Sequence, residues 1–264
     1  RGGGMNKPLH WAFVTGGGGD IGGAIADVLA SRGWGVICAD LAADRTAEVV
    51  ARVRAAGGVA EAMTLDVTDE AAVNDAARAA LAIGDVRVLV NNAGHAFSYK
   101  MRDLDFATWR RDIALNLDSA FLCTRAFQDH LLACGGVIVN MGSVNGLSGS
   151  FGHPAYSAAK AGLLHFTQCL AVEYGPHGVR VNAVAPGTVR TRAWDGRLAA
   201  NPQVFEEVTA WYPLRKVATP LDVARAVAFL ASDEASHITG VILPVDGGIT
   251  AGLTQLHQSI TQQK

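Results

Sequence analysis

The chain has 264 residues, of which half are hydrophobic and 17% are charged, so it can bury a large core. Its formal net charge of −2 provides no basic field that would draw nucleic acid or an anionic membrane surface. Its apolar runs are short and are interrupted by glycine or charge, which argues against a membrane-spanning helix.

Taken in order, the chain alternates short apolar strands with helical patterns. Strands are predicted at 11–15, 36–40, 60–66, 86–91, 137–141, 179–185 and 241–245. Helices are predicted at 21–32, 43–56, 70–81, 154–174 and 221–231. Two more helices are expected between Asp105 and Ala133, because the pattern at 108–131 is too long for one surface helix. A mixed segment separates the last two strands.

These elements predict the fold class. The strands are continuous apolar runs, which is typical of strands covered by helices on both faces. Repeated strand–helix units imply right-handed crossovers and a parallel sheet. Pro244 lacks a backbone donor and favours an edge position for the last strand. We predict one α/β domain over residues 5–250, a Rossmann fold with a doubly wound parallel seven-stranded sheet and helices on both faces, followed by a tail at 251–264.

The remaining composition gives expectations about location and metals. The four residues before Met5 look like an expression remnant, and no secretory signal follows them. The cysteines show no spacing typical of metal ligands or a redox pair, so we interpret them as small buried hydrophobes and expect no metal site. A reduced compartment, the cytoplasm, is the expected location. These cysteines are Cys38, Cys123, Cys134 and Cys169.

A glycine-rich stretch, Thr15–Gly23, follows the first strand and opens the first helix. Glycines there let the backbone approach a pyrophosphate, and the helix N-terminus offers free N–H groups. Asp40 ends the second strand, where a carboxylate can accept hydrogen bonds from ribose hydroxyls and would repel a 2′-phosphate. The next residue is Leu41 rather than an arginine, and Arg45 is expected to be solvated on the following helix. The cofactor predicted is NAD.

Tyr156 and Lys160 lie four residues apart in a predicted helix and therefore share one face. A cation near a phenol favours the phenolate and lowers the pKa of the tyrosine from its usual value of roughly 10. A tyrosine tuned towards neutral pH can exchange a proton with an alcohol. Such a pair is also common on ordinary helix surfaces, so its meaning depends on the other motifs.

Further motifs follow one another along the chain: the Thr15–Gly22 turn, Asp66-Val67, Asn91-Asn92-Ala93-Gly94, Asn116, Ser143, Tyr156 with Lys160, Pro186-Gly187 and Asp246-Gly247-Gly248. In this order and spacing the chain resembles the short-chain dehydrogenase/reductase family over nearly its whole length. The resemblance implies an NAD(P)-dependent oxidoreductase acting on CH–OH groups. It also implies a homotetramer, with the helices at 116–133 and 154–174 at an interface.

The resemblance implies a role for each of four polar residues. Tyr156 is the expected general acid/base on the substrate oxygen, and Lys160 is expected to lower its pKa and bind the nicotinamide ribose. Ser143 is expected to hold the substrate oxygen, and Asn116 to position a water that links Lys160 to solvent. Taken singly, Ser143 is equally well a turn residue and Asn116 a helix-break residue. The cofactor contacts implied are Gly16, Gly18, Gly19, Asp20, Ile21, Asp40, Leu41, Asp66, Val67, Asn92, Ala93, Gly94, Tyr156, Lys160, Pro186, Gly187, Val189 and Thr191.

Asp20 departs from the family's turn, which usually has glycine at this position. A carboxylate near a pyrophosphate is repulsive, but aspartate is also a preferred residue at a helix N-cap. We therefore expect Asp20 to cap the helix at 21–32 with its side chain turned from the phosphates.

The substrate is expected beside Tyr156, where the resemblance places His95, Ser143, Asn145, His153 and Trp194. The segment 190–212 is the expected lid. Its arginines, Arg190, Arg192 and Arg197, either bind an acidic group on the substrate or solvate a mobile loop, and we favour the loop because exposed arginines are common.

Three functions remain open at this point. The leading one is an NAD-dependent oxidoreductase that transfers a hydride between a secondary alcohol (a polyol, sugar or hydroxy acid) and its ketone. The alternative within enzymes is a 3-oxoacyl-thioester reductase of fatty-acid type. A non-catalytic dinucleotide-sensing module is the third, and the intact set of Asn116, Ser143, Tyr156 and Lys160 argues against it.

Overall fold

A computed structural model describes residues 10–252 of the chain. The expected N-terminal remnant, and all but the first two residues of the expected tail, lie outside this part. Seven parallel strands form one sheet, in the order β3 (Val59–Thr64), β2 (Gly35–Asp40), β1 (Trp11–Thr15), β4 (Val86–Asn91), β5 (Val137–Met141), β6 (Arg180–Pro186) and β7 (Ile242–Val245). The strand order reverses between β1 and β4, which is the place where doubly wound sheets bind ligands.

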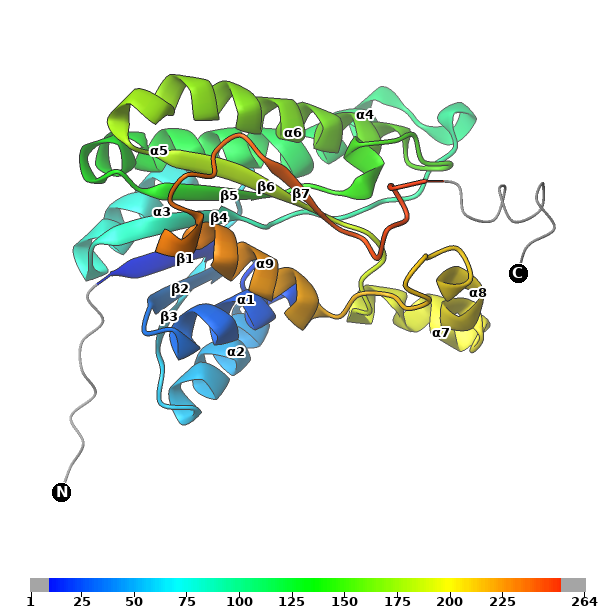
Figure 1. The fold of residues 1–264 in the computed structure, drawn as a ribbon, viewed down its shortest axis with the longest axis horizontal. Helices are drawn as coiled ribbons and strands as arrows, with labels where there is room; N and C mark the ends of the chain where they lie inside the picture. Colours follow the sequence, from blue (N-terminus) through cyan, green and yellow to red (C-terminus); the bar gives the residue numbers. More distant parts are fainter. Residues whose placement is uncertain (1–9, 253–264) are drawn as a thin grey trace.

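Helices cover both faces of this sheet (Figure 1). One face carries α1 (Asp20–Ser31), α2 (Ala43–Ala55) and α9 (Pro220–Ala231). The other carries α3 (Glu70–Ile83), α5 (Ser119–Cys134) and α6 (Pro154–Tyr174). Among the described residues, no helix combines the length and apolarity needed to cross a bilayer. The predicted fold class, a Rossmann-type doubly wound sheet with helices on both faces, is confirmed.

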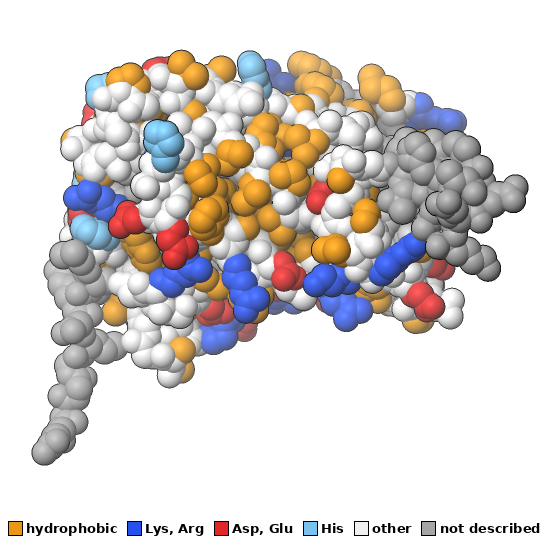
Figure 2. Space-filling model, viewed as in Figure 1, with side chains coloured by type: hydrophobic (Ala, Val, Ile, Leu, Met, Phe, Trp, Pro, Cys, Tyr) orange, Lys and Arg blue, Asp and Glu red, His pale blue; other side chains and the backbone are white. Residues whose placement is uncertain are grey.

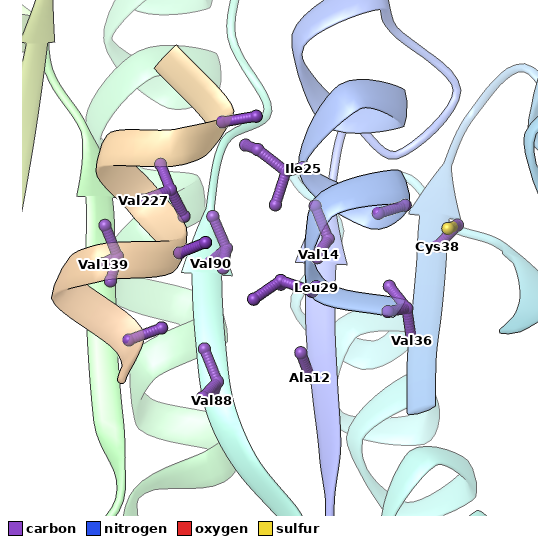
Figure 3. Close-up of a cluster of buried hydrophobic side chains, with 14 of the residues drawn as sticks. Ala12, Val14, Ile25, Leu29, Val36, Cys38, Val88, Val90, Val139 and Val227 are labelled. Atoms are coloured by element: carbon purple, nitrogen blue, oxygen red, sulfur yellow. The ribbon is translucent and has the colours of Figure 1, made fainter. Parts of the chain in front are cut away.

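The core lies in two apolar layers, one under each set of helices. In the layer of Figure 3, Ile25 and Leu29 of α1 and Val227 of α9 point at the strands. They meet alternate residues of the central strands, such as Val14 of β1 and Val90 of β4, and all five are fully buried. Successive residues of these strands face opposite layers, which is why the strands are apolar throughout.

Most predicted boundaries match the structure within two residues, and α6 matches at both ends. Pro244 lies in β7, which is an edge strand as predicted. The segment before β5 differs from the prediction of two separate helices, because α4 (Phe106–Ile113) runs into α5 through a π-helical turn at Ala114–Asp118. The wider turn keeps the helical path continuous and contains Asn116, so this residue modifies the helix without breaking it.

The mixed segment after β6 contains two short helices, α7 (Asp195–Ala200) and α8 (Val204–Thr209). Figure 1 places them beyond the carboxyl ends of the strands, below the loops that follow β4 and β5. The aromatic rings of Trp194 and Phe205 pack together with centroids 5.2 Å apart. This small lobe therefore forms one wall of the region where the sheet presents its loops.

Candidate active site

Two adjoining cavities lie at the carboxyl ends of the strands. The larger has a volume of about 700 Å³ and extends from the ends of β5 and β6 to the lobe after β6. The smaller, of about 520 Å³, lies over the ends of β1 and β2. Residues such as Ile21, Gly94 and Thr191 line both cavities, so the two form a continuous groove. Its length suits an extended ligand with one end at β2 and the other beside Tyr156.

The glycine-rich turn forms the floor of the smaller cavity. Gly16 has a φ of +64°, which favours glycine, and a Cβ at Gly22 would lie 2.0 Å from the Gly16 carbonyl oxygen. Glycine at both positions therefore lets the first turn of α1 pack directly on the loop. The N-terminus of α1 then faces the cavity, where its free N–H groups favour an anionic ligand. This floor fits the pyrophosphate of a dinucleotide.

Asp40 lines the outer end of the smaller cavity. One carboxylate oxygen accepts the Gly18 N–H at 3.0 Å, and the other accepts the Ala42 N–H at 2.9 Å. These bonds fix the carboxylate, and each oxygen retains capacity to accept a hydroxyl group. Arg45 is exposed on the first turn of α2, as expected, and it also lines this cavity. A nucleotide ribose at this end would meet one fixed carboxylate and one nearby guanidinium.

Asp20 does not have its predicted role as a helix cap. The N-cap of α1 is Gly19, and it makes no side-chain capping bond; Asp20 is the first helical residue. Its carboxylate instead accepts hydrogen bonds from the backbone N–H and the guanidinium of Arg192, both at 2.6 Å. The prediction was wrong because the lid segment supplies a cation that is distant in the sequence. The same contact shows that Arg192 is engaged rather than merely solvated.

Tyr156, Lys160 and Ser143 converge on the larger cavity. Tyr156 and Lys160 lie on the first turns of α6, which Pro154 opens at its first position, a favoured place for proline. The Lys160 ammonium donates to the Met141 carbonyl at 2.8 Å and lies 5.7 Å from the centre of the Tyr156 ring. Ser143, at the end of β5, hydrogen-bonds with Tyr156. The phenol, hydroxyl and ammonium form one polar cluster in the cavity wall.

The pKa values in this cluster differ from the sequence expectation. Burial raises the pKa of Tyr156, and the hydrogen bond with Ser143 only partly opposes that shift. Burial lowers the pKa of Lys160 to about 8, because its side chain is only 3% exposed and the charged form loses its hydration. The structure therefore does not show the predicted lowering of the tyrosine pKa by Lys160.

Asn116 is held beside this cluster by its carboxamide. Its Oδ1 accepts the His95 N–H at 3.1 Å, and its Nδ2 donates to the carbonyls of His95 and Asp112, both at 3.0 Å. A Cβ at Gly94 would lie 2.7 Å from Asn116 Oδ1 and 3.2 Å from Lys160 Nζ. Glycine at 94 therefore allows the loop after β4, the π-helical turn and α6 to meet at one point.

The larger cavity is lined by basic and aromatic side chains. Arg197 stacks on Trp194, with its guanidinium carbon 4.7 Å from the ring centre, and His95 and His153 also line the cavity. None of the described residues that line this cavity is acidic. The carboxyl group of Asp112 is buried near both histidines, and burial raises its pKa. Arg190 lies outside this cavity and stacks on Phe205 at 4.6 Å.

The groove contains nearly all the residues named from the sequence. All five substrate candidates line the larger cavity, and of the cofactor candidates only Gly18 lines neither cavity, since its N–H is turned to Asp40. Asn116 lies behind the wall. Several further lining residues were not predicted from the sequence: Leu65, Leu115, Ser150, Thr188 and Ile249.

Comparison with known proteins adds a family context to this geometry. A family model described as enoyl-(acyl carrier protein) reductase matches residues 18–250. The cis-4-hydroxycyclohexanecarboxylate dehydrogenase of Sinomonas cyclohexanicum is 44% identical over 245 residues, which cover 91% of this chain and 96% of that protein. The family-model match begins within the glycine-rich turn and includes the Tyr156 cluster and the segment 190–212.

Two solved structures are similar over almost the whole chain. A short-chain dehydrogenase/reductase family oxidoreductase from Burkholderia thailandensis is 43% identical with a TM-score of 0.90, covering 98% of this chain and 99% of that one. A candidate NAD(P)-dependent gluconate 5-dehydrogenase from Beutenbergia cavernae, with NADP bound at low occupancy, is 37% identical with a TM-score of 0.87, covering 94% and 99%. Both are far above the level at which only the fold is shared.

Proposed function

The chain belongs to the short-chain dehydrogenase/reductase family of oxidoreductases, and on that basis we propose that it interconverts a hydroxy acid and the matching keto acid with NAD as the cofactor. Its named relatives are dehydrogenases that act on CH–OH groups. The observation that carries the proposal is the convergence of Tyr156, Ser143 and Lys160 on a cavity that continues into the glycine-floored groove.

The residues of the groove fit a dinucleotide. The Gly16–Gly22 floor and the α1 N-terminus suit its pyrophosphate, and the fixed Asp40 carboxylate suits the adenosine ribose. Lys160 is proposed to bind the nicotinamide ribose. When bound, the dinucleotide supplies the acceptor or donor for the hydride. The proposed preference for NAD rests on Asp40. NADP is the competing cofactor, because Arg45 lines the same cavity as Asp40 and one similar structure has NADP bound.

The proposed proton path begins at Tyr156. In the direction of alcohol oxidation, the substrate hydroxyl gives its proton to the Tyr156 oxygen, while Ser143 donates a hydrogen bond to the substrate oxygen. Tyr156 accepts this proton as a phenolate, and we propose that the charge of Lys160, buried beside the ring, favours that form against the opposing effect of burial on the tyrosine pKa. Asn116 fixes the loop at Gly94 next to Lys160 and is proposed to hold the water through which the proton leaves.

The hydroxy-acid preference rests on the charges of the cavity wall. Arg197 and His153 line the larger cavity but not the cofactor cavity, His95 lines both, and none of the described residues lining the larger cavity is acidic. A guanidinium binds a carboxylate with paired hydrogen bonds, so a substrate that carries a carboxylate several atoms from its hydroxyl fits this wall. The relative that acts on cis-4-hydroxycyclohexanecarboxylate has such a substrate.

A matched pair of substrates tests this preference. We expect Arg197→Met to raise the KM for cis-4-hydroxycyclohexanecarboxylate by at least about tenfold, since a hydrogen bond to a charged group contributes about 1.5–3 kcal/mol. The KM for cyclohexane-1,4-diol should change less than about twofold. Arg190→Met is the control, because Arg190 stacks outside the cavity. Equal losses on both substrates, or a wild-type preference for the diol, would favour a polyol substrate instead.

The oligomeric state and the cytoplasmic location remain predictions. Phe121 on α5 and Val172 on α6 are 51% and 80% exposed, which suits the helix interface that the family resemblance implies. Figure 2 shows a second group of apolar side chains over α9 and β7. Light scattering of the purified chain should give the mass of a tetramer, and a monomer at micromolar concentration would contradict the expectation.

A further inference from the structure

A cluster of potential metal ligands lies at the opposite end of the sheet from the groove. Asp85 directly precedes β4, and His130 and Cys134 lie on the last turns of α5. The spacing of His130 and Cys134, four residues apart, puts both side chains on one face of the helix. The spacing of the cysteines gives no sign of this cluster, because Cys134 is grouped here with a histidine and an aspartate.

The ligand atoms of this cluster are close enough to share one ion. The Asp85 Oδ1 atom lies 3.1 Å from His130 Nε2, and both lie within 4.8 Å of Cys134 Sγ. Tetrahedral zinc has bonds of about 2.0 Å to nitrogen and 2.3 Å to sulfur, so a nitrogen ligand and a sulfur ligand of one zinc ion lie roughly 3.5 Å apart. Small side-chain rotations therefore suffice to bring all three atoms to a common centre.

The other carboxylate oxygen of Asp85 is held by different groups. Asp85 Oδ2 lies 3.1 Å from His10 Nδ1 and accepts from Arg87 Nε at 2.7 Å. Arg87 also donates to the backbone carbonyl of Cys134 at 2.8 Å, so it ties Asp85 to the helix end. Outer hydrogen bonds of this kind orient the ligands of a metal and are typical of protein metal sites. They leave Oδ1 directed to His130.

The position of the cluster permits an ion to enter. The side chains of Asp85 and His130 are 33% and 30% exposed, and Cys134 is partly buried. The site therefore offers one carboxylate, one imidazole and one thiol at the boundary between protein and solvent.

We propose that Asp85, His130 and Cys134 form a binding site for a divalent cation of the zinc type, with water as the fourth ligand. A thiolate, an imidazole and a carboxylate together suit zinc better than magnesium or calcium, which prefer oxygen ligands alone. The ion links the end of α5 to the loop before β4, two elements that the groove does not use. Its role is to stabilise the fold, because the reacting groups lie at the other end of the strands.

Cobalt(II) provides the spectroscopic test, since a thiolate ligand gives it a charge-transfer absorption in the near ultraviolet. We expect the full-length protein, freed of metal with a chelator, to bind one Co²⁺ per chain with this band, and Zn²⁺ to displace it. Cys134→Ser and His130→Gln should remove the band and weaken binding at least about tenfold. Zn²⁺ at a hundredfold excess over its Kd should raise the melting temperature by roughly 5 °C or more.

Two control variants separate this site from incidental binding. Cys169→Ser and His165→Gln change an exposed cysteine and an exposed histidine of α6, outside the cluster, and should leave the band unchanged. A wild-type protein without the band, or a band that survives Cys134→Ser, would overturn the proposal. Turnover with the dinucleotide should be the same in Cys134→Ser as in the wild type, so failure of this proposal leaves the proposed oxidoreductase activity untouched.

Discussion

The carboxylate of Asp20 is paired with Arg192, a residue 172 positions later in the chain. Both the backbone N–H and the guanidinium of Arg192 donate to it at 2.6 Å, and the guanidinium also reaches towards the Gly18 carbonyl at 3.5 Å. The contact joins the glycine-rich turn to the segment that leads into α7. It neutralises the one acidic group in the floor of the proposed pyrophosphate site and holds the lid segment beside the groove.

This pairing predicts a non-additive pair of variants. Arg192→Met should weaken dinucleotide binding by about tenfold, because it leaves the Asp20 carboxylate unpaired beside the phosphates, an interaction worth roughly 1–2 kcal/mol at this exposure. Asp20→Asn alone should change affinity less than about threefold, and the double variant should recover most of the loss. Calorimetric titration of all four proteins measures the coupling. Additive effects would show that the pair does not act on the phosphates.

The role of Tyr156 predicts a loss of turnover without loss of binding. Tyr156→Phe keeps the ring and removes the hydroxyl, so turnover should fall by about a thousandfold, within the 10²–10⁴ range of acid/base catalysis. Dinucleotide affinity should stay within about threefold. Tyr174→Phe is the matched control, because that hydroxyl lies at the far end of α6 and bonds to Gln128. Near-normal turnover in Tyr156→Phe would rule out the assignment.

The fixed carboxylate of Asp40 predicts discrimination between cofactors. A 2′-phosphate about 4 Å from it would be repelled by several kcal/mol at an effective dielectric constant near 20, so kcat/KM should favour NAD over NADP at least about a hundredfold. Asp40→Ser together with Leu41→Arg should narrow or reverse the ratio. Arg45→Ala tests the competing contact: if the wild type uses both cofactors equally and this change removes NADP use, Arg45 binds the phosphate.

The buried Lys160 predicts a pH dependence of stability. Its pKa is about 8 in the folded protein and 10.5 for a freely solvated lysine, so between these values the unfolded chain retains a proton that the folded chain has released. The free energy of unfolding therefore rises with pH, by about 2 kcal/mol between pH 8 and pH 9.5 from this residue alone. Below pH 8 the contribution is constant, since both states hold the proton.

Other groups act in the opposite direction over this range. Burial raises the pKa of the Cys38 and Cys123 thiols to about 12. Above pH 9 these thiols lose their protons in the unfolded state but not in the folded state, which lowers the free energy of unfolding. The measurement is therefore a comparison of urea unfolding of the wild type and Lys160→Met at pH 8 and pH 9.5, in which the cysteine effect cancels. Equal pH slopes in the two proteins would contradict the lowered pKa of Lys160.

The sequence was sufficient for the elements whose signal is local. Continuous apolar runs located β1, β4 and β5 at their observed boundaries, and Pro244 indicated the edge strand, because burial on both faces and the missing N–H are properties of the segment itself. The polar residues that follow successive strands were assigned to one groove, since parallel strands bring their carboxyl ends to the same edge of the sheet.

The tertiary structure decided the partners and the charges. Aspartate is a residue type favoured at helix N-caps, but the Asp20 carboxylate accepts a hydrogen bond from Arg192 instead of capping α1. The spacing of Tyr156 and Lys160 suggests a lowered tyrosine pKa, but burial raises that pKa. Likewise, nothing local brings Asp85 to His130. The local pattern determines which residues are buried in a strand or helix, whereas a hydrogen-bond partner or a pKa depends on groups that only folding brings within a few ångströms and on the water that folding removes.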